Sequence, residues 1–337
     1  MEFIINWLVE SFINIRIFLY RLKVELNNNP DAPNARNKKT IGIPRTLFYF
    51  KHPELWASFF EELGVKVILS DSTNREVLDD SLKLSDNESC LSVKLFAGHI
   101  NNLKGKCDLM FVPKFSSEKK GYFSCPKFLI LPHLGKLFTD YSKEIISQEF
   151  NSSYFPKKLS LFMLGLKFSH NPLKIYKAAD IAIKKEKEKI KAKTEDFNRK
   201  ISSNKMKLLV ISHPYIIYDT YMNLDLFKKL DGLGVTSIVI DEVPYREKDT
   251  YVKWDFANQF LNSLDYLSEN GINIDGILQI SNFNCGCDSV VVDVIKEKIS
   301  GRNIHYLNLI IDEHTGEAGI ITRLEAFVDS INGVKNG

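Results

Sequence analysis

The 337-residue chain has few cysteines for its length and little excess of charge of either sign. Its five cysteines are an odd number spread over a long chain, which is not the pattern of a secreted disulfide framework, and we expect no secretory signal. The 45 basic and 42 acidic side chains leave a net charge of +3, which gives no electrostatic footprint for nucleic acid. We therefore expect a cytoplasmic protein with reduced thiols and no nucleic-acid partner.

Long apolar runs are missing as well. No uninterrupted run approaches the roughly 20 apolar residues that a membrane-spanning helix needs. The first 26 residues are unusually apolar, but Glu10, Arg16 and Arg21 interrupt them. Apolar side chains recur at helical spacing on more than one side of this segment, so we expect a helix buried against the protein body or another subunit. Attachment of residues 1–26 to a membrane surface is the alternative that we do not favour.

Short cofactor motifs are also absent. The cysteines do not form the local C-x-x-C clusters of ferredoxins or zinc fingers, so the fold must assemble any site that they share. Neither a Walker phosphate loop nor a G-x-G-x-x-G stretch occurs, and we do not expect this chain to bind ATP itself.

The chain does contain two long series of alternating apolar strands and amphipathic helices. Continuously apolar strands in such an alternation are typical of parallel sheets covered by helices. We predict an α/β fold in which two Rossmann-like domains with mainly parallel sheets face a cleft, with an amino-terminal helix in addition. The predicted divisions are an apolar helix and linker at 1–38, a first domain at 39–170, a connecting helix at 171–204 and a second domain at 205–337.

Individual elements follow from local signals. Asn171–Pro172 is typical of a helix start, since an amide caps the helix and proline suits its first position. The predicted strands are Thr40–Pro44, Val65–Leu69, Cys107–Pro113, Phe128–Pro132, Leu208–Ile211, Ser237–Asp241, Gly276–Ile280 and Tyr306–Ile310. The predicted helices are Pro53–Leu63, Asp219–Leu233, Trp254–Asn270, Ser289–Ser300 and Glu317–Ile331.

The cysteines fall at different places on this plan. Cys125 lies in a loop after one predicted strand, Cys285 follows another, and Cys90 opens an apolar helical stretch whose end amides would lower a thiol pKa. Cys107 begins a strand, where a buried small hydrophobic residue is expected. The spacing of Cys287 from Cys285 could bring both sulfurs to one site. The residues alone leave core packing and metal ligation both open.

Several longer strings carry a family resemblance. The stretches IGIPRTLFYFKHPELWASFFEELGVKVILS, DNESCLSVKLFAGHI, FVPKF and CPKF are followed in the second half by SHPYIIYDTYMN, FNCGCDS and DEHTGEAGIITRLEAFVD. Together they resemble the activase-related proteins of the 2-hydroxyacyl-CoA dehydratase system, from about Lys39 to Asp329. The same superfamily includes the dehydratase subunits and the double-cubane cluster proteins. The resemblance implies cysteine thiolates around a [4Fe-4S] cluster between Rossmann-like domains.

Carried over by position, the family's cysteines fall on Cys90, Cys125 and Cys285, with Cys287 as a possible further ligand. The resemblance implies that three thiolates around four irons leave one iron open, as catalytic zinc sites keep one open position. It also implies two kinds of partner. One is an ATP-dependent activase with its own cluster, and the other is a related subunit in a homo- or hetero-oligomer.

Three further residues are candidates for proton transfer near such a cluster. The string from Asp312 to Glu317 contains Glu313 and His314, and His213 follows a predicted strand. Histidine titrates near neutrality and can serve as an acid or base. The other interpretation is structural, a strand-to-helix turn around His314 and a hydrogen-bonded cap near His213.

The sequence leaves three functions to be separated. The first is a low-potential reductase or dehydratase component fed by an activase. The second is an iron–sulfur module that only relays electrons or carries a cluster, and a fourth protein ligand would favour it. The third is a cluster-free ligand-binding relative.

Overall fold

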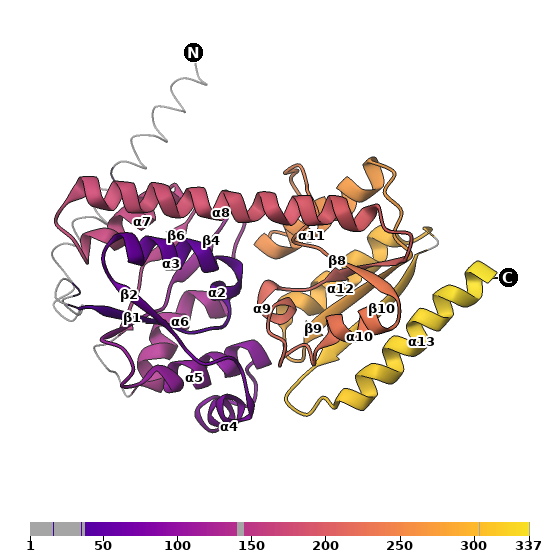
Figure 1. Cartoon of the computed structure of the whole chain (residues 1–337), viewed down its shortest axis with the longest axis horizontal. Coiled ribbons are helices and arrows are strands. Elements are labelled where there is room, and N and C mark those ends of the chain that lie inside the picture. The colour runs from indigo at the N-terminus through magenta and orange to yellow at the C-terminus, as the bar shows by residue number, and fades with distance from the viewer. Residues whose placement is uncertain (1–15, 17–34, 36–37, 140–144, 303, 337) are drawn as a thin grey trace, which may run out of the picture.

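The computed structural model describes residues 16, 35, 38–139, 145–302 and 304–336. The predicted amino-terminal helix lies outside the described residues apart from Arg16, so it stays a prediction. Within the described part, two α/β halves lie side by side, and one long helix runs along both of them (Figure 1). None of the helices described there is both long and apolar enough to cross a membrane.

The first half is built on a four-stranded parallel sheet with the strand order β2-β1-β3-β5. A second, two-stranded parallel sheet pairs β4 with β6. The strands are β1 (Thr40–Ile43), β2 (Lys66–Leu69), β3 (Leu109–Phe111), β4 (Lys114–Ser117), β5 (Ile145–Ile146) and β6 (Glu149–Asn151). The helices are α2 (Phe48–Lys51), α3 (Pro53–Glu62), α4 (Arg75–Leu84), α5 (Leu91–Leu103), α6 (Pro126–Phe138) and α7 (Lys157–Leu166).

The core of this half is rich in aromatic side chains. Trp56 and Phe60 of α3 lie with their ring centroids 5.1 and 5.2 Å from that of Phe111 at the end of β3. All three side chains are fully buried. Aromatic edge-to-face pairs of this kind contribute on the order of 1 kcal/mol each beyond the area that they bury. They fix α3 across the sheet.

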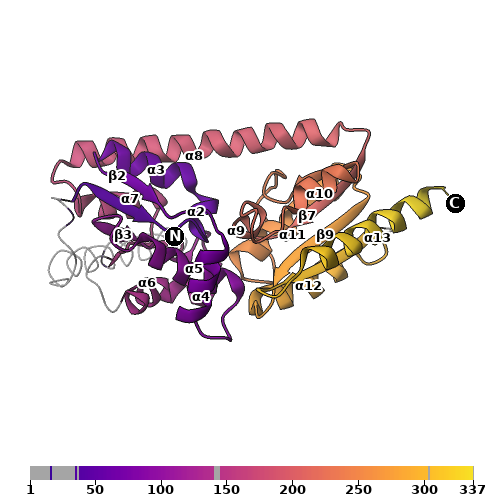
Figure 2. The same ribbon diagram turned by 60° about the horizontal axis from the view of Figure 1, so that its bottom comes forward.

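The connecting helix α8 (Pro172–Ile201) begins where its sequence predicts. The Asn171 side chain accepts hydrogen bonds from the N–H groups of Leu173 and Lys174, and Pro172 occupies the first turn. Along its length α8 makes ion pairs with both halves, from Glu186 to Lys157 of α7 and from Lys193 to Asp241 after β8. The helix therefore fixes one half relative to the other (Figure 2).

The second half repeats the plan of the first. Its sheet has the order β10-β9-β7-β8 and is also parallel throughout. The strands are β7 (Met206–Ile211), β8 (Val235–Val239), β9 (Gly276–Asn282) and β10 (His305–Ile311), and the helices are α9 (Pro214–Ile217), α10 (Leu226–Gly232), α11 (Asp255–Glu269), α12 (Gly286–Ile299) and α13 (Glu317–Asn336). In each main sheet the first and third strands in chain order lie together at the centre. The predicted fold class, two Rossmann-like halves with mainly parallel sheets, is confirmed.

One predicted strand is wrong. Phe128–Pro132 lies inside helix α6, whose buried residues Phe128, Leu131, Gly135 and Phe138 recur at helical spacing. A short apolar run reads equally well as a buried strand or a buried helix. Pro126 stands at the first helical position after Cys125, which is a helix start signal that the strand assignment does not account for.

A second prediction needs correction at its start. The helix expected at Asp219–Leu233 is confined to α10. The polar side chains that precede α10 form hydrogen bonds with nearby backbone groups and stabilise turns there. Asp219 Oδ1 accepts from the N–H groups of Tyr221 and Met222, and the Asn223 amide donates to the Ile216 and Ile217 carbonyls. Such local bonds compete with helix formation.

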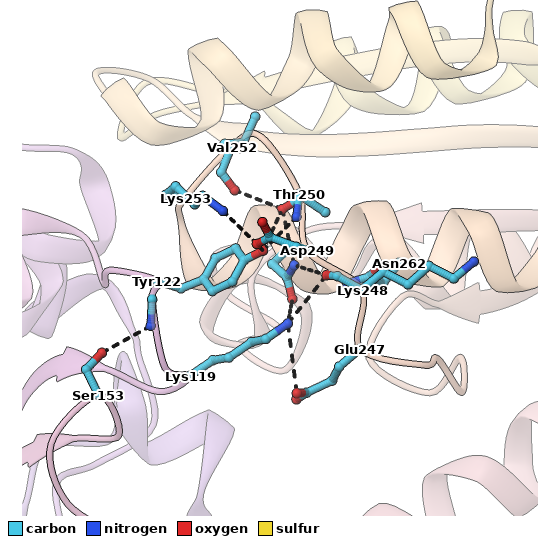
Figure 3. A network of polar contacts seen from close by, with 12 residues as sticks. Lys119, Tyr122, Ser153, Glu247, Lys248, Asp249, Thr250, Val252, Lys253 and Asn262 are labelled. Atoms are coloured by element: carbon cyan, nitrogen blue, oxygen red, sulfur yellow. Dashed lines mark hydrogen bonds and ion pairs between the residues drawn. The ribbon is translucent and has the colours of Figure 1, made fainter. Parts of the chain in front are cut away.

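The loop before α6 is tied to the second half (Figure 3). The Tyr122 hydroxyl donates to Asp249 Oδ1 at 2.6 Å and accepts from the Thr250 N–H at 2.7 Å. Lys119 donates to Asn258 Oδ1 at 2.9 Å, and the Phe123 N–H donates to the Lys253 carbonyl at 2.8 Å. These bonds position the segment that leads to Cys125 against α11.

Candidate metal centre

Four of the five cysteines line one cavity between the two halves. Cys90 and Cys125 come from the first half, and Cys285 and Cys287 come from the second. The polar residues around them are Ser92, His213, Asp255 and Asp288. The rest of the wall is apolar and largely aromatic, formed by Val93, Phe123, Phe128, Tyr215, Trp254, Phe256, Ala257, Phe260 and Val291. The structure thus brings together the three cysteines that the sequence singles out.

Each of these three cysteines occupies the N-cap position of a helix of at least 13 residues. Cys90 is the N-cap of α5, Cys125 that of α6 and Cys285 that of α12. The unpaired N–H groups and the dipole of a helix favour negative charge at its N-terminus. Three helix N-termini therefore point their positive ends at one group of thiols, which is a suitable setting for thiolates.

Burial works against ionisation of two of these thiols. Burial raises the pKa of Cys90, and the Val93 N–H opposes that rise. Burial also raises the pKa of Cys285, the neighbouring Asp288 carboxylate raises it further, and the Asp288 N–H opposes it. A metal ion would reverse this balance, since a coordinating thiol is deprotonated outright.

Cys125 and Cys287 interact directly across the boundary between the halves. The hydrogen bond between them is the main cause that lowers the pKa of Cys125 below its ordinary value, although burial of Cys125 opposes it. The same bond, together with burial, raises the pKa of Cys287. Of the two thiols, Cys125 is therefore the one whose pKa the contact lowers.

His213 reaches the cavity because of the strand order in the second sheet. It follows β7, Cys285 follows β9, and these two strands pair in parallel at the centre of the sheet. Carboxyl ends of adjacent parallel strands meet at one edge, where open α/β sheets bind their ligands. His213 Nε2 lies 2.7 Å from Asp288 Oδ1, and both side chains are buried.

Asp255 is a cavity residue that sequence reasoning missed. Its Oδ2 accepts hydrogen bonds from Ser124 Oγ at 2.7 Å and from the Glu118 N–H at 3.0 Å, whereas its buried Oδ1 has no hydrogen-bond partner within the described part of the chain. Burial raises the pKa of this carboxyl, and the Glu118 charge raises it further. An acidic residue at a helix start is common without any function, so the sequence carried no distinguishing signal.

Glu313 and His314 are not among the residues that line the cavity. Glu313 forms an ion pair with Lys94 of α5. His314 is exposed, and its N–H donates to Asp312 Oδ1 at 3.0 Å. Thr315 Oγ1 donates to the same oxygen and accepts from the Asp312 N–H. This local arrangement matches the structural interpretation, a strand-to-helix turn, and gives no support to proton transfer by His314.

Cys107 is the cysteine that does not line the cavity. Its sulfur contacts the Leu103 carbonyl at 3.6 Å and lies beside Gly42 of β1, where a Cβ atom would come within 2.5 Å of it. Its surroundings belong to the sheet of the first half, as predicted for a packing residue.

The donor set fits an iron–sulfur cluster in its chemistry. Thiolates hold such clusters, and helix-end amides and burial tune them. The His213 Nδ1, Asp255 Oδ1 and Asp288 Oδ2 atoms are buried and have no hydrogen-bond partner among the residues that the structure describes. Buried polar atoms usually have hydrogen-bond partners, so unpaired ones beside thiols are typical of a binding site for a metal ion or cofactor.

Comparison with protein families gives a match to the profile described as "CoA enzyme activase uncharacterised domain", over residues 40–243. This stretch is more than half of the chain and extends from β1 to just beyond β8. It contains Cys90, Cys125 and His213, and Cys285 and Cys287 lie beyond it. The search of curated proteins gives no match.

Solved structures give only distant likenesses. A zinc-bound variant of AdcAII from Streptococcus pneumoniae is 11% identical, with 87% of this chain and 99% of that chain covered and a TM-score of 0.28. The laminin-binding protein Lbp of Streptococcus pyogenes is 9% identical, with 88% and 99% covered and a TM-score of 0.27. Nitrogenase Cp1 is 13% identical, with 92% and 60% covered and a TM-score of 0.26.

Proposed function

Because this chain belongs to the family described as the CoA enzyme activase uncharacterised domain, we propose that it is an iron–sulfur protein of the 2-hydroxyacyl-CoA dehydratase type. In this proposal it is a component of a low-potential reductase or dehydratase. The observation that carries the proposal is the convergence of Cys90, Cys125 and Cys285, each at the N-cap position of a long helix, on one cavity between the halves.

The cavity residues would each have a defined part in such a centre. Cys90, Cys125 and Cys285 would hold a [4Fe-4S] cluster, which supplies low-potential single electrons when bound. The N-termini of α5, α6 and α12 would stabilise the negative charge of the thiolates. The apolar wall, with Phe128, Phe256 and other aromatic rings, would keep water away from them. A cavity formed by both halves makes the site depend on their relative position.

Two partners follow from the proposal. A separate ATP-dependent activase with its own cluster would supply the electrons. A related subunit, or a second copy of this chain, would complete the oligomer. The family to which the chain belongs supports the inference of an activase, and the oligomer is part of the same proposal.

A second candidate function rests on Cys287. This fourth thiol lines the same cavity and is hydrogen-bonded to Cys125. If it binds the fourth iron, no position stays open for substrate, and the protein would relay electrons or carry a cluster without performing a reaction of its own. The two functions therefore differ in whether one iron exchanges its ligand.

The test uses the full chain purified without oxygen. Iron and acid-labile sulfide are quantified, and the dithionite-reduced protein is examined by EPR. About four irons and four sulfides per chain, with a signal from a reduced [4Fe-4S] cluster, are expected. Zinc alone, or no metal, would overturn the proposal in favour of a cluster-free relative. A signal that changes on addition of small anionic or thiol ligands supports an open iron, and an unchanged signal supports the electron-transfer function.

A further inference from the structure

Three potential metal ligands of different chemistry meet at one end of the cavity. His213, Cys285 and Asp288 each offer one ligand atom, and these atoms all lie within 4.8 Å of one another. They come from the carboxyl end of β7, the N-cap of α12 and the first turn of α12. Ligands at bond lengths of about 2.0–2.3 Å from one tetrahedral ion lie roughly 3–4 Å apart. Small side-chain movements would therefore bring the three atoms into coordination of a single ion.

Two of these side chains leave buried polar atoms unpaired. His213 and Asp288 are each 4% exposed. Their only mutual hydrogen bond joins Nε2 to Oδ1, and Nδ1 of the ring and Oδ2 of the carboxylate have no partner among the described residues. An unpaired buried polar atom costs on the order of 1–3 kcal/mol. A cation at this end of the cavity would remove that cost for the carboxylate.

The imidazole ring is held in place before any ion binds. The Tyr215 ring stacks on it at a centroid distance of 4.9 Å and an interplanar angle of 11°. Phe256 contacts it edge-on at 4.3 Å and 88°. The ring therefore has little freedom to turn away, and pre-organised ligands bind metals more tightly.

We propose that His213, Cys285 and Asp288 bind a single divalent cation of the zinc class. One nitrogen, one sulfur and one oxygen donor suit a borderline ion such as Zn²⁺ and do not suit Ca²⁺ or Mg²⁺, which prefer oxygen ligands throughout. Three protein ligands leave the fourth tetrahedral position to solvent. On binding, the Cys285 thiol loses its proton to solvent and the sulfur–metal bond forms, with no change in oxidation state.

This site goes beyond the iron–sulfur centre and competes with it. Both would use Cys285, so an ion held there and a complete cluster exclude each other. Substitution of Cys90 should impair the cluster and not the divalent-cation site, because Cys90 belongs to the cluster ligands and not to the three-residue set. Substitution of His213 or Asp288 should impair the divalent-cation site and not the cluster.

The test is a titration of the metal-free full chain, kept reduced and without oxygen, with Co²⁺. We expect one Co²⁺ per chain, intense visible bands typical of tetrahedral coordination, a sulfur-to-cobalt band in the ultraviolet, and displacement by Zn²⁺. Weak octahedral bands or no binding would overturn the proposal. Neither result of the Co²⁺ titration decides whether the anaerobically purified protein contains a cluster, so the two proposals are tested separately.

Variants identify the ligands. His213→Ala, Asp288→Asn and Cys285→Ser should each weaken Co²⁺ binding by at least about tenfold, whereas the matched control Cys90→Ser should bind it as the wild type does. Equal loss in Cys90→Ser would show that the ion uses the cluster thiols and would overturn the assignment. His213→Gln keeps a buried side chain of similar size, and circular dichroism reports whether each variant is folded. Prior loading with Zn²⁺ should lower cluster formation during reconstitution, and undiminished formation would contradict a shared Cys285.

Discussion

The ammonium group of Lys94 lies 2.6 Å from the carboxylate of Glu313, and the pair joins the two halves beside the cavity. Lys94 belongs to α5, the helix that begins at Cys90, and Glu313 belongs to the turn after β10. The Lys94 side chain is almost fully buried. Glu313 therefore helps to position the helix that presents Cys90.

Glu313→Gln should lower the free energy of unfolding, because a buried ammonium that loses its partner is left uncompensated. We expect a loss of about 1–3 kcal/mol, since Glu313 itself is partly exposed. Urea unfolding at pH 7 measures it. The matched control is Asp79→Asn, which removes an exposed pair with Arg75 and should cost less than about 1 kcal/mol. Equal small losses in both variants would contradict the role of the pair.

The pH dependence of this pair has a definite sign. Burial raises the pKa of Glu313. The hydrogen bond from Lys94 and its charge lower the pKa by more than burial raises it, so the pKa lies below the ordinary value of 4.5. A lowered carboxyl pKa contributes stability above the unfolded value that is lost as pH falls through the folded value. The difference between wild type and Glu313→Gln should therefore shrink as the pH falls below 4.5.

The cysteines should differ sharply in their effect on bound iron. Serine at Cys90, Cys125 or Cys285 should each lower the iron content of anaerobically purified protein severalfold, since an alcohol replaces a thiolate ligand. Cys107→Ser is the matched control, because Cys107 packs near Leu103 and Gly42 and does not line the cavity. Iron and sulfide assays measure the outcome. Loss of iron in Cys107→Ser in a folded protein would contradict the placement of the cluster.

The family resemblance, more than the spacing, predicted that Cys90, Cys125 and Cys285 share a site, and strand order explains part of their convergence. Parallel strands end at one edge, so residues that follow β7 and β9 must lie close together once those strands are neighbours. The alternation of strands and helices did not predict that β7 and β9 are neighbours, so the proximity of His213 to Cys285 is a finding of the structure. The predicted cleft between two Rossmann-like domains anticipated that Cys90 and Cys125 of the first half would meet Cys285 of the second, as the cavity lining shows.

The start of α6 at Cys125–Pro126 has a local signal, the same one that at Asn171–Pro172 correctly predicted α8. Other features depend on long-range contacts that no local pattern indicates. The hydrogen bond from Cys287 to Cys125 joins residues far apart in sequence, and so does the pairing of Glu313 with Lys94. Asp255 had the ordinary appearance of an acidic helix start.

His99 should make the fold sensitive to mild acid. The side chain is fully buried, with Nδ1 2.8 Å from Ser70 Oγ and Nε2 3.0 Å from Thr73 Oγ1. Burial, assisted by the charge of Arg45, lowers its pKa from 6.5 to about 3. The folded protein keeps the ring neutral while the unfolded chain takes up a proton below pH 6.5, so stability is lost as the pH falls from 6.5 towards 3.

The measurement compares unfolding free energies at several pH values in that window. His99 should contribute a slope approaching about 1.4 kcal/mol per pH unit, and His99→Gln should remove this contribution, although it also lowers stability at pH 7. The control is His170→Gln, at an exposed position, which should leave the slope unchanged. An unchanged slope in His99→Gln would show that the ring binds its proton as readily in the folded protein as in the unfolded chain, which would contradict the prediction.

Substitution of Cys287 tests whether this residue is a cluster ligand or only a hydrogen-bond donor to Cys125. The interaction with the Cys287 side chain is the main cause that lowers the pKa of Cys125. Cys287→Ala should therefore move the alkylation of Cys125 to higher pH, followed by peptide mass spectrometry across a pH series. The Cys107 peptide of the same sample is the internal control and should keep its profile.

The iron content of the same variant then decides the role in the loaded protein. If Cys287 only donates a hydrogen bond to the Cys125 sulfur, Cys287→Ala should retain the iron, and the lost bond should lower the reduction potential of the centre, because hydrogen bonds to cluster sulfur stabilise the more negative reduced state. Potentiometric EPR titration measures that shift. If Cys287 is the fourth ligand, the variant should lose iron or gain a site that exchanges with added thiols. Retained iron with an unaltered potential would contradict both roles and leave Cys287 as a wall of the cavity, whose sulfur contacts Cys125 only before metal binds.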